Sequence, residues 1–94
     1  MSAHKKRSTI KAVTVHETVT LVLSARGRRS FSLWHESTGK KVYWGYDTGM
    51  TATTGGGVPL VADAIHSQAD YTGDVYAITP AGTGDVTIGV AEVA

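Results

Sequence analysis

Apolar and polar residues alternate along most of this chain, in short runs separated by glycine, proline and other turn-forming residues. An early run is rich in β-branched residues and places Val13 and Val15 on one face. A later run alternates serine with Phe31 and Leu33 in the same way. This two-residue period is typical of half-buried β-strands, and we find no stretch with the 3.6-residue period of an amphipathic helix. The pattern predicts an all-β protein.

Further strands are expected at 19–23 and 42–46, where β-branched and aromatic residues recur, whereas 58–60 is expected to be extended before and around its proline and 63–68 to form a short strand or a turn. In the first of these runs, Val19, Leu21 and Leu23 are expected to share one buried face. The segment 47–57 is rich in threonine and glycine and predicts a long loop. Short strands separated by turn signals favour an antiparallel β-sandwich or a jelly-roll-like barrel.

The tripeptide Gly-Asp-Val occurs at 73–75 and again at 84–86, and each copy precedes a strand-forming run. The turn formers of 80–83 lie between the two runs, so we expect an antiparallel hairpin. One face of that hairpin would carry Val75, Ala77, Val86, Ile88 and Val90. A second sheet, including Phe31 and Leu33, is expected to cover this face.

The first nine residues are polar and basic without periodicity, which predicts a flexible basic arm at 1–9 and a single β-sandwich domain at 10–94. The chain has no cysteine, so no disulfide adds to the stability of this small domain. No apolar run approaches the roughly 20 residues of a membrane-spanning helix. Association of copies is therefore the expected additional source of stability, and we favour a homo-oligomer.

Charge is distributed unevenly along the chain. All nine lysines and arginines lie at or before Lys41, together with only two acidic residues, which gives residues 1–41 a net charge of +7. Residues 42–94 hold six acidic residues and no base, a net charge of −6. The asymmetry indicates contact between copies or with an acidic partner, unless folding mixes both signs on one solvated surface.

Two groups of residues are candidates for contacts with a partner or between subunits. The basic candidates are Lys5, Lys6, Arg7, Lys11, Arg26, Arg28 and Arg29. An acidic protein surface or simple solubility explains them better than nucleic acid, which is not expected as a partner. The aromatic candidates are Trp34, Trp44 and Tyr46. With Tyr43 they form either a stacking platform for sugars or bases, or a core and subunit interface.

No catalytic or cofactor site is apparent, and we expect a non-enzymatic protein without cofactor or metal. The triplet Asp47-Thr48-Gly49 is similar to the catalytic loop of aspartic proteases, but it lies mid-chain and precedes a glycine-rich run. The four histidines lack the spacing of metal ligands. The three consecutive glycines at 55–57 are not followed by the residues of a phosphate-binding loop.

Several motifs together resemble small β-rich virion proteins of tailed bacteriophages. They are Val-Tyr-Trp-Gly at 42–45, Gly-Met-Thr at 49–51, Gly-Val-Pro-Leu at 57–60, Gly-Asp-Val-Tyr-Ala-Ile at 73–78, Gly-Thr-Gly-Asp-Val at 82–86 and Ala-Glu-Val at 91–93. The resemblance covers about residues 10–93, and its second half is the more specific. This chain departs from the pattern at 44–46, where a small glycine-rich turn is usual, and by its basic arm.

The resemblance implies a structural protein of the virion, assembled in the host cytoplasm. We expect a capsid decoration, or cement, protein that binds and stabilises the shell of major capsid protein as a homo-oligomer, with a trimer favoured. The alternatives are a neck, tail or baseplate component of the virion, or a small carbohydrate-binding β-sandwich. The basic arm is expected to anchor the protein to an acidic surface of the shell or of a neighbouring copy.

Overall fold

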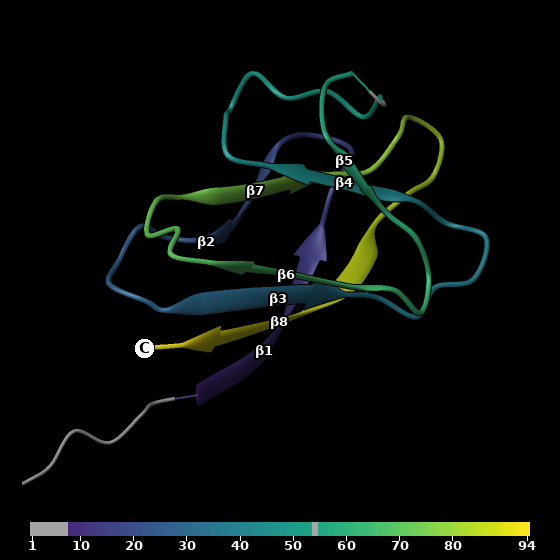
Figure 1. Ribbon diagram of the computed structural model, residues 1–94. Helices are drawn as coiled ribbons and strands as arrows, with labels where there is room; N and C mark the ends of the chain where they lie inside the picture. Colours follow the sequence, from purple (N-terminus) through teal and green to yellow (C-terminus); the bar gives the residue numbers. More distant parts are fainter. Residues whose placement is uncertain (1–7, 54) are drawn as a thin grey trace, which may run out of the picture.

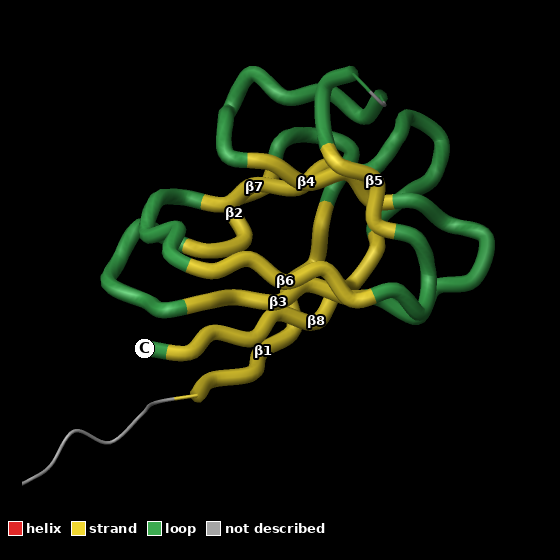
Figure 2. The backbone as a smooth tube through the Cα atoms, viewed as in Figure 1, coloured by secondary structure: helices red, strands yellow, loops and turns green. Residues whose placement is uncertain are grey.

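The computed structural model of the protein describes residues 8–53 and 55–94, which form eight β-strands and no helix (Figures 1 and 2). The strands are β1 (Ser8–Val15), β2 (Thr20–Leu23), β3 (Ser30–Trp34), β4 (Val42–Gly45), β5 (Val58–Leu60), β6 (Ile65–Ala69), β7 (Val75–Ile78) and β8 (Val86–Val93). This part of the chain accordingly offers no long apolar helix that would fit across a membrane. The all-β prediction is confirmed.

Two four-stranded antiparallel sheets face each other. Sheet A has the strand order β1-β8-β3-β6 and sheet B the order β2-β7-β4-β5; they are the lower and upper layers of Figure 1. The pairs β1 with β8, β2 with β7, β3 with β6, and β4 with β5 describe one long antiparallel ribbon that is folded over at the β4–β5 connection. Eight strands wound in this way over two sheets form a jelly roll. The predicted sandwich or jelly-roll-like fold is confirmed.

The apolar faces of the two sheets meet in one core. Phe31, Leu33 and Val15 are almost fully buried, and Val13 is partly buried against them, as the two-residue period predicts. The buried cluster consists of Val15, Val22, Leu23, Phe31, Leu33, Val42, Trp44, Leu60, Val75, Ala77, Val86, Ile88 and Val90. Every described strand except β6 contributes to this cluster, so the core holds the two sheets together.

The predicted C-terminal hairpin is wrong. The valine of each Gly-Asp-Val tripeptide does begin a strand, but β7 lies in sheet B and β8 lies in sheet A. The connection 79–85 crosses between the sheets, and within it the Thr79 hydroxyl donates a hydrogen bond to the Gly84 carbonyl at 2.9 Å. The physical reason is coverage: a hairpin would leave all five apolar residues on one open face, whereas the crossing places them on facing sheets, where they bury one another.

The predicted face of the second strand is also partly wrong. Val22 and Leu23 are both buried, whereas Leu21 is exposed and Val19 is partly buried. The pairing of β2 with β7 shifts register between Leu21 and Leu23. A β-bulge of this kind interrupts the alternation of side chains, so two consecutive residues of β2 reach the core.

The connection between β4 and β5, described at 46–53 and 55–57, folds over the outer face of sheet B (Figure 2). Its Met50 is buried, as is Tyr43 on the outer side of β4. A β-carbon added to Gly57 would lie 3.0 Å from the Tyr43 Cβ and 3.1 Å from the Met50 Cε. Glycine at this position therefore permits the close approach by which the loop covers part of sheet B.

The boundary of the predicted N-terminal arm needs a correction. Ser8 and Thr9 were placed in the arm, but they belong to β1, where they pair with Val93 and Glu92 of β8. Lys5, Lys6 and Arg7 lie outside the described residues. Their role as an anchor stays a prediction.

Replacing Ile88 by alanine is expected to lower the free energy of unfolding by about 2–5 kcal/mol, because the change removes buried methyl groups and leaves a cavity between the sheets. Urea denaturation of the wild type and the variant measures this loss. The matched control is Thr87→Ala, an exposed neighbour on the same strand, which should change stability by less than about 0.5 kcal/mol. Equal effects of the two substitutions would contradict the packing described above.

Candidate functional site

Among the residues that the structure describes, none on the outer face of sheet A is charged. Side chains alternate along a strand, so the residues between the core positions point away from sheet B. The registers place them in rows; Ile10, Ala91, Ser32 and Ser67 make one row across all four strands. The face consists of Ser8, Ile10, Ala12 and Thr14 on β1, Thr87, Gly89, Ala91 and Val93 on β8, Ser30, Ser32 and Trp34 on β3, and Ile65, Ser67 and Ala69 on β6.

This face differs from its counterpart on sheet B, which the β4–β5 loop partly covers. The β1 and β6 residues of the outer face of sheet A are exposed, and those of the two central strands are mostly half-buried. Most of its side chains are small, and the hydroxyls of Ser32 and Ser67 are hydrogen bonded to each other at 2.8 Å. A flat surface without charges is less costly to remove from water than a charged one, and the cores of protein interfaces are depleted of charge in the same way.

Trp34 is the one large aromatic residue on this face. A β-carbon added to Gly89 would lie within 2.2–2.5 Å of three atoms of the indole ring, so the ring lies directly against the β8 backbone. An open groove of about 360 Å³ borders the ring. It is lined by Ala12, Trp34, His35, Glu36, Ser37, Thr87, Ile88 and Gly89. Of the predicted contact residues that the structure describes, only Trp34 lies on the charge-free face.

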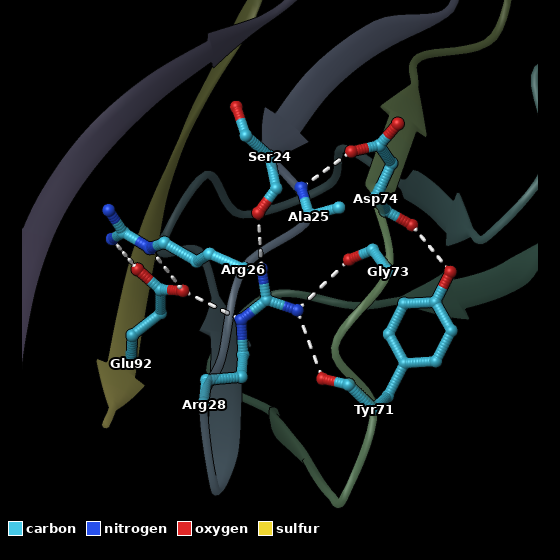
Figure 3. Close-up of polar contacts among 8 residues, drawn as sticks. All are labelled: Ser24, Ala25, Arg26, Arg28, Tyr71, Gly73, Asp74 and Glu92. Atoms are coloured by element: carbon cyan, nitrogen blue, oxygen red, sulfur yellow. Dashed lines mark hydrogen bonds and ion pairs between the residues drawn. The ribbon is translucent and has the colours of Figure 1, made fainter.

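Two of the predicted basic contact residues instead stabilise one end of the sandwich (Figure 3). Arg26 forms an ion pair with Glu92 through its Nε and Nη2 atoms, and the Arg28 Nε donates to the same carboxylate at 2.6 Å. Glu92 follows Val86, Ile88 and Val90 on the inward face of β8, where an unpaired carboxylate would be strongly unfavourable. The two guanidinium groups compensate that burial.

Arg28 also joins the β2–β3 connection, in which it lies, to the β6–β7 connection. Its Nη1 donates to the carbonyls of Tyr71 and Gly73, both at 3.0 Å, and its Nη2 donates to the carbonyl of Ser24 at 2.5 Å (Figure 3). The Arg28 side chain is only 1% exposed. The prediction that Arg28 is a surface contact is therefore wrong, because its guanidinium group is buried and donates its hydrogen bonds to other groups of the fold.

The two arginines also change the acidity of Glu92. Hydrogen bonding and charge from Arg26, and then from Arg28, lower the pKa of Glu92 from 4.5 to about 2, although burial acts in the opposite direction. Because the pKa is lower in the folded protein, the ion pairs stabilise it fully above about pH 4.5. That contribution is lost as the pH falls from about 4.5 towards 2.

The substitution Glu92→Gln is expected to lower the free energy of unfolding at pH 7 by about 3 kcal/mol, since it leaves buried Arg28 without its counter-charge. The difference from wild type should shrink below pH 4 and nearly vanish at pH 2. Denaturation across this pH range measures it, with exposed Glu36→Gln as the control that should follow wild type. A constant difference between wild type and Glu92→Gln at all pH values would contradict the assigned role.

The predicted aromatic platform does not form on one surface. Trp44 is 3% exposed, and its Nε1 donates to the His66 Nδ1 at 3.0 Å, which links sheet B to sheet A. Tyr46 is 43% exposed and stacks on Tyr71 with 3.8 Å between ring centroids. Trp44 and Tyr46 each pack edge-on against Phe31 and against each other. Trp44 is therefore a core residue rather than a contact, and Tyr46 lies apart from Trp34.

In the triplet Asp47-Thr48-Gly49, whose sequence is similar to a protease loop, Asp47 has a local structural role. Its carboxylate accepts a hydrogen bond from the Gly49 amide at 3.0 Å and so closes a turn. Buried His35 is equally satisfied, through the Leu60 carbonyl at 2.8 Å and the Ser37 amide at 3.2 Å. Within residues 8–53 and 55–94, no three His, Cys, Asp or Glu side chains come together as a metal site.

Of the remaining predicted contacts that the structure describes, Lys11 lies on β1 and Arg29 directly precedes β3, and both are exposed.

The charge-free face was not predicted from the sequence. Its signal lay in the polar phase of each strand, where Ser, Thr, Ala and Gly recur without Lys or Glu. The position of acidic Glu92 in the inward phase of β8 was a signal for the two arginines, since a buried carboxylate requires a basic partner.

No protein-family model matches this chain, and no curated protein matches it in sequence. Its function is therefore argued from the geometry of sheet A and from motifs within the chain.

Replacing Gly89 by alanine is expected to displace Trp34 and to cost about 1–3 kcal/mol of stability, because the new methyl group occupies space now held by the indole. Denaturation followed by circular dichroism gives the cost. Gly27→Ala is the matched control, since nothing lies within 4 Å of a β-carbon there. In a Trp34→Ala background the Gly89→Ala cost should fall below about 0.5 kcal/mol; an unchanged cost would mean that the clash is with something else.

Proposed function

We propose that this chain is a non-enzymatic structural protein of a bacteriophage virion, a capsid decoration protein that binds and stabilises the shell of major capsid protein. Three features support the proposal. The fold is a jelly roll, an architecture used by viral capsid proteins among others. One whole sheet face is free of charge. The motifs from Val42 to Val93 resemble those of tailed-phage virion proteins.

The charge-free outer face of sheet A carries the proposal. A shell presents an extended protein surface, and binding to it requires a broad complementary face rather than a deep pocket. Four strands provide such a face, with small side chains that allow close approach and with Trp34 and Ile65 as larger apolar contacts. Tryptophan is enriched among the residues that contribute most to protein interfaces. Exposed Lys11 on β1 and Arg29 just before β3 add positive charge to this part of the protein, and such charge raises the rate of encounter with an acidic surface.

A charge placed in the middle of the face tests the proposal. Ala91→Glu and Ala91→Lys should each weaken binding to undecorated shells by about tenfold or more, because either charge would be buried against the shell without a partner. Co-sedimentation with shells at a series of protein concentrations gives the affinity. Because both signs of charge are tested, a simple change in long-range attraction is distinguished from the cost of burial.

The matched control is Ala81→Glu, at an exposed position of the β7–β8 connection away from sheet A. It should bind shells as the wild type does. Wild-type protein that fails to bind shells would overturn the proposed function. Unchanged binding of both Ala91 variants would overturn the assignment of the face.

A small carbohydrate-binding module is the second candidate, and the groove beside Trp34 favours it. A half-buried indole next to Glu36 and Thr87 combines a stacking surface with polar groups, which suits a sugar ring. Titration with oligosaccharides, followed by tryptophan emission, distinguishes the two candidates. A saturable change that is lost in Trp34→Ala would favour the carbohydrate module over the decoration protein.

A further inference from the structure

Sheet A has two open edges, formed by β1 and β6. Each of these strands pairs with only one neighbour in the described part of the chain, β8 and β3 respectively, so each has a row of backbone groups on its other side. In Figure 1 they are the lowest and the highest strands of the lower layer. Free strand edges of this kind can accept a strand from another chain.

The edges of sheet B, formed by β2 and β5, are protected against pairing with another strand, unlike those of sheet A. Strand β5 is three residues long and contains Pro59, which has no backbone N–H to donate. Strand β2 is four residues long and carries the bulge after Leu21. Proline, bulges and shortness are the usual devices that prevent edge-to-edge pairing. The β6 edge has none of them, and β1 is eight residues long with one charged residue, Lys11.

Both open edges expose a large apolar side chain. Ile10 on β1 is 75% exposed and Ile65 on β6 is 68% exposed, the two highest values among the large apolar residues described. Val61, which directly follows β5 in the connection to β6, is exposed as well. From Ser8 to Ala12, every residue of β1 is exposed even though it pairs with β8. The structure thus presents two apolar edges on opposite sides of one sheet, and no described strand covers either of them.

The charges beside the two edges are opposite in sign. Asp63 and Asp70 stand immediately outside the two ends of β6, both exposed and both with a φ of 65°. The amide of Asp63 donates to the His35 carbonyl and that of Asp70 to the Arg29 carbonyl, so the β3 side fixes the backbone of both. On the other edge, β1 carries exposed Lys11. One edge is therefore apolar and acidic, and the other is apolar and basic.

We propose that copies of this chain associate head to tail, with β1 of one copy added to the free edge of β6 of the next. The three antiparallel pairings of sheet A make β1 and β6 antiparallel to each other. A second copy in the same orientation therefore continues the antiparallel ladder, with Ile10 and Ile65 near the junction and Lys11 between the two aspartates. The contact is heterologous, so the β1 edge of every copy uses the β6 edge of another. This association does not require that the outer face of sheet A bind a shell, although Ile10 and Ile65 belong to both surfaces.

Two single variants, alone and mixed, test this arrangement. Ile10→Lys disables the β1 edge and Ile65→Lys disables the β6 edge, and neither residue is part of the core. Light scattering coupled to size-exclusion chromatography should give an oligomer for the wild type and a monomer of 9.9 kDa for each variant alone. An equimolar mixture should give a species of twice that mass and nothing larger, because each variant retains the edge that the other lacks.

The matched control is Leu21→Lys, which places the same charge on exposed apolar surface of the protected β2 edge. It should associate as the wild type does. The double variant Asp63→Asn, Asp70→Asn keeps residues that tolerate positive φ, and it should weaken association about three- to tenfold at low salt and remove most of its salt dependence.

A wild-type monomer at concentrations up to millimolar would overturn the proposal. So would one variant that still forms the wild-type oligomer alone, since that indicates pairing of like edges. Failure of the mixture to form a dimer would do the same. Circular dichroism of each variant, compared with wild type, excludes unfolding as the cause of a monomer.

Discussion

The structure depends on the mutual burial of β7 and β8 across the core. Each strand has one apolar face, and two such faces on the same side of one sheet would require a further layer to cover them. Placing the strands in facing sheets solves this problem, and β7 and β8 then become central strands of their sheets. The other strands add beside them, and because the chain crosses between the sheets at every connection except β4–β5, the eight strands take the jelly-roll order.

One end of the sandwich is held by charge rather than by apolar packing. Glu92 continues the inward phase of β8 beyond the apolar core, and Arg28 reaches it from the β2–β3 connection. Because the same guanidinium binds the carbonyls of Ser24, Tyr71 and Gly73, one buried side chain joins segments far apart in the sequence. The basic turn is thus mainly a structural element, although its sequence resembles a binding patch.

The outer faces of the two sheets differ in how much of each is covered by the described chain. The β4–β5 loop, which contains buried Met50, covers part of the outer face of sheet B (Figure 2), and no described segment covers the outer face of sheet A. The outer face of sheet A avoids charge, and its edges lack the proline and bulge found on sheet B. In the proposals above, the face binds a shell and the edges join copies. The two roles are compatible, since edge-joined copies would align their faces into a larger surface.

The sequence by itself determined the fold class and most strands, because the two-residue period that places Phe31 and Leu33 inward is a local property. It also contained the inward phase of Val86 and Ile88. It did not determine which sheet receives β7 and β8, since a hairpin and a crossing use the same local pattern. Tertiary structure alone decided that Arg28 is buried against Glu92 and that Trp34 lies over Gly89, because each contact joins residues from strands or loops that only folding brings together.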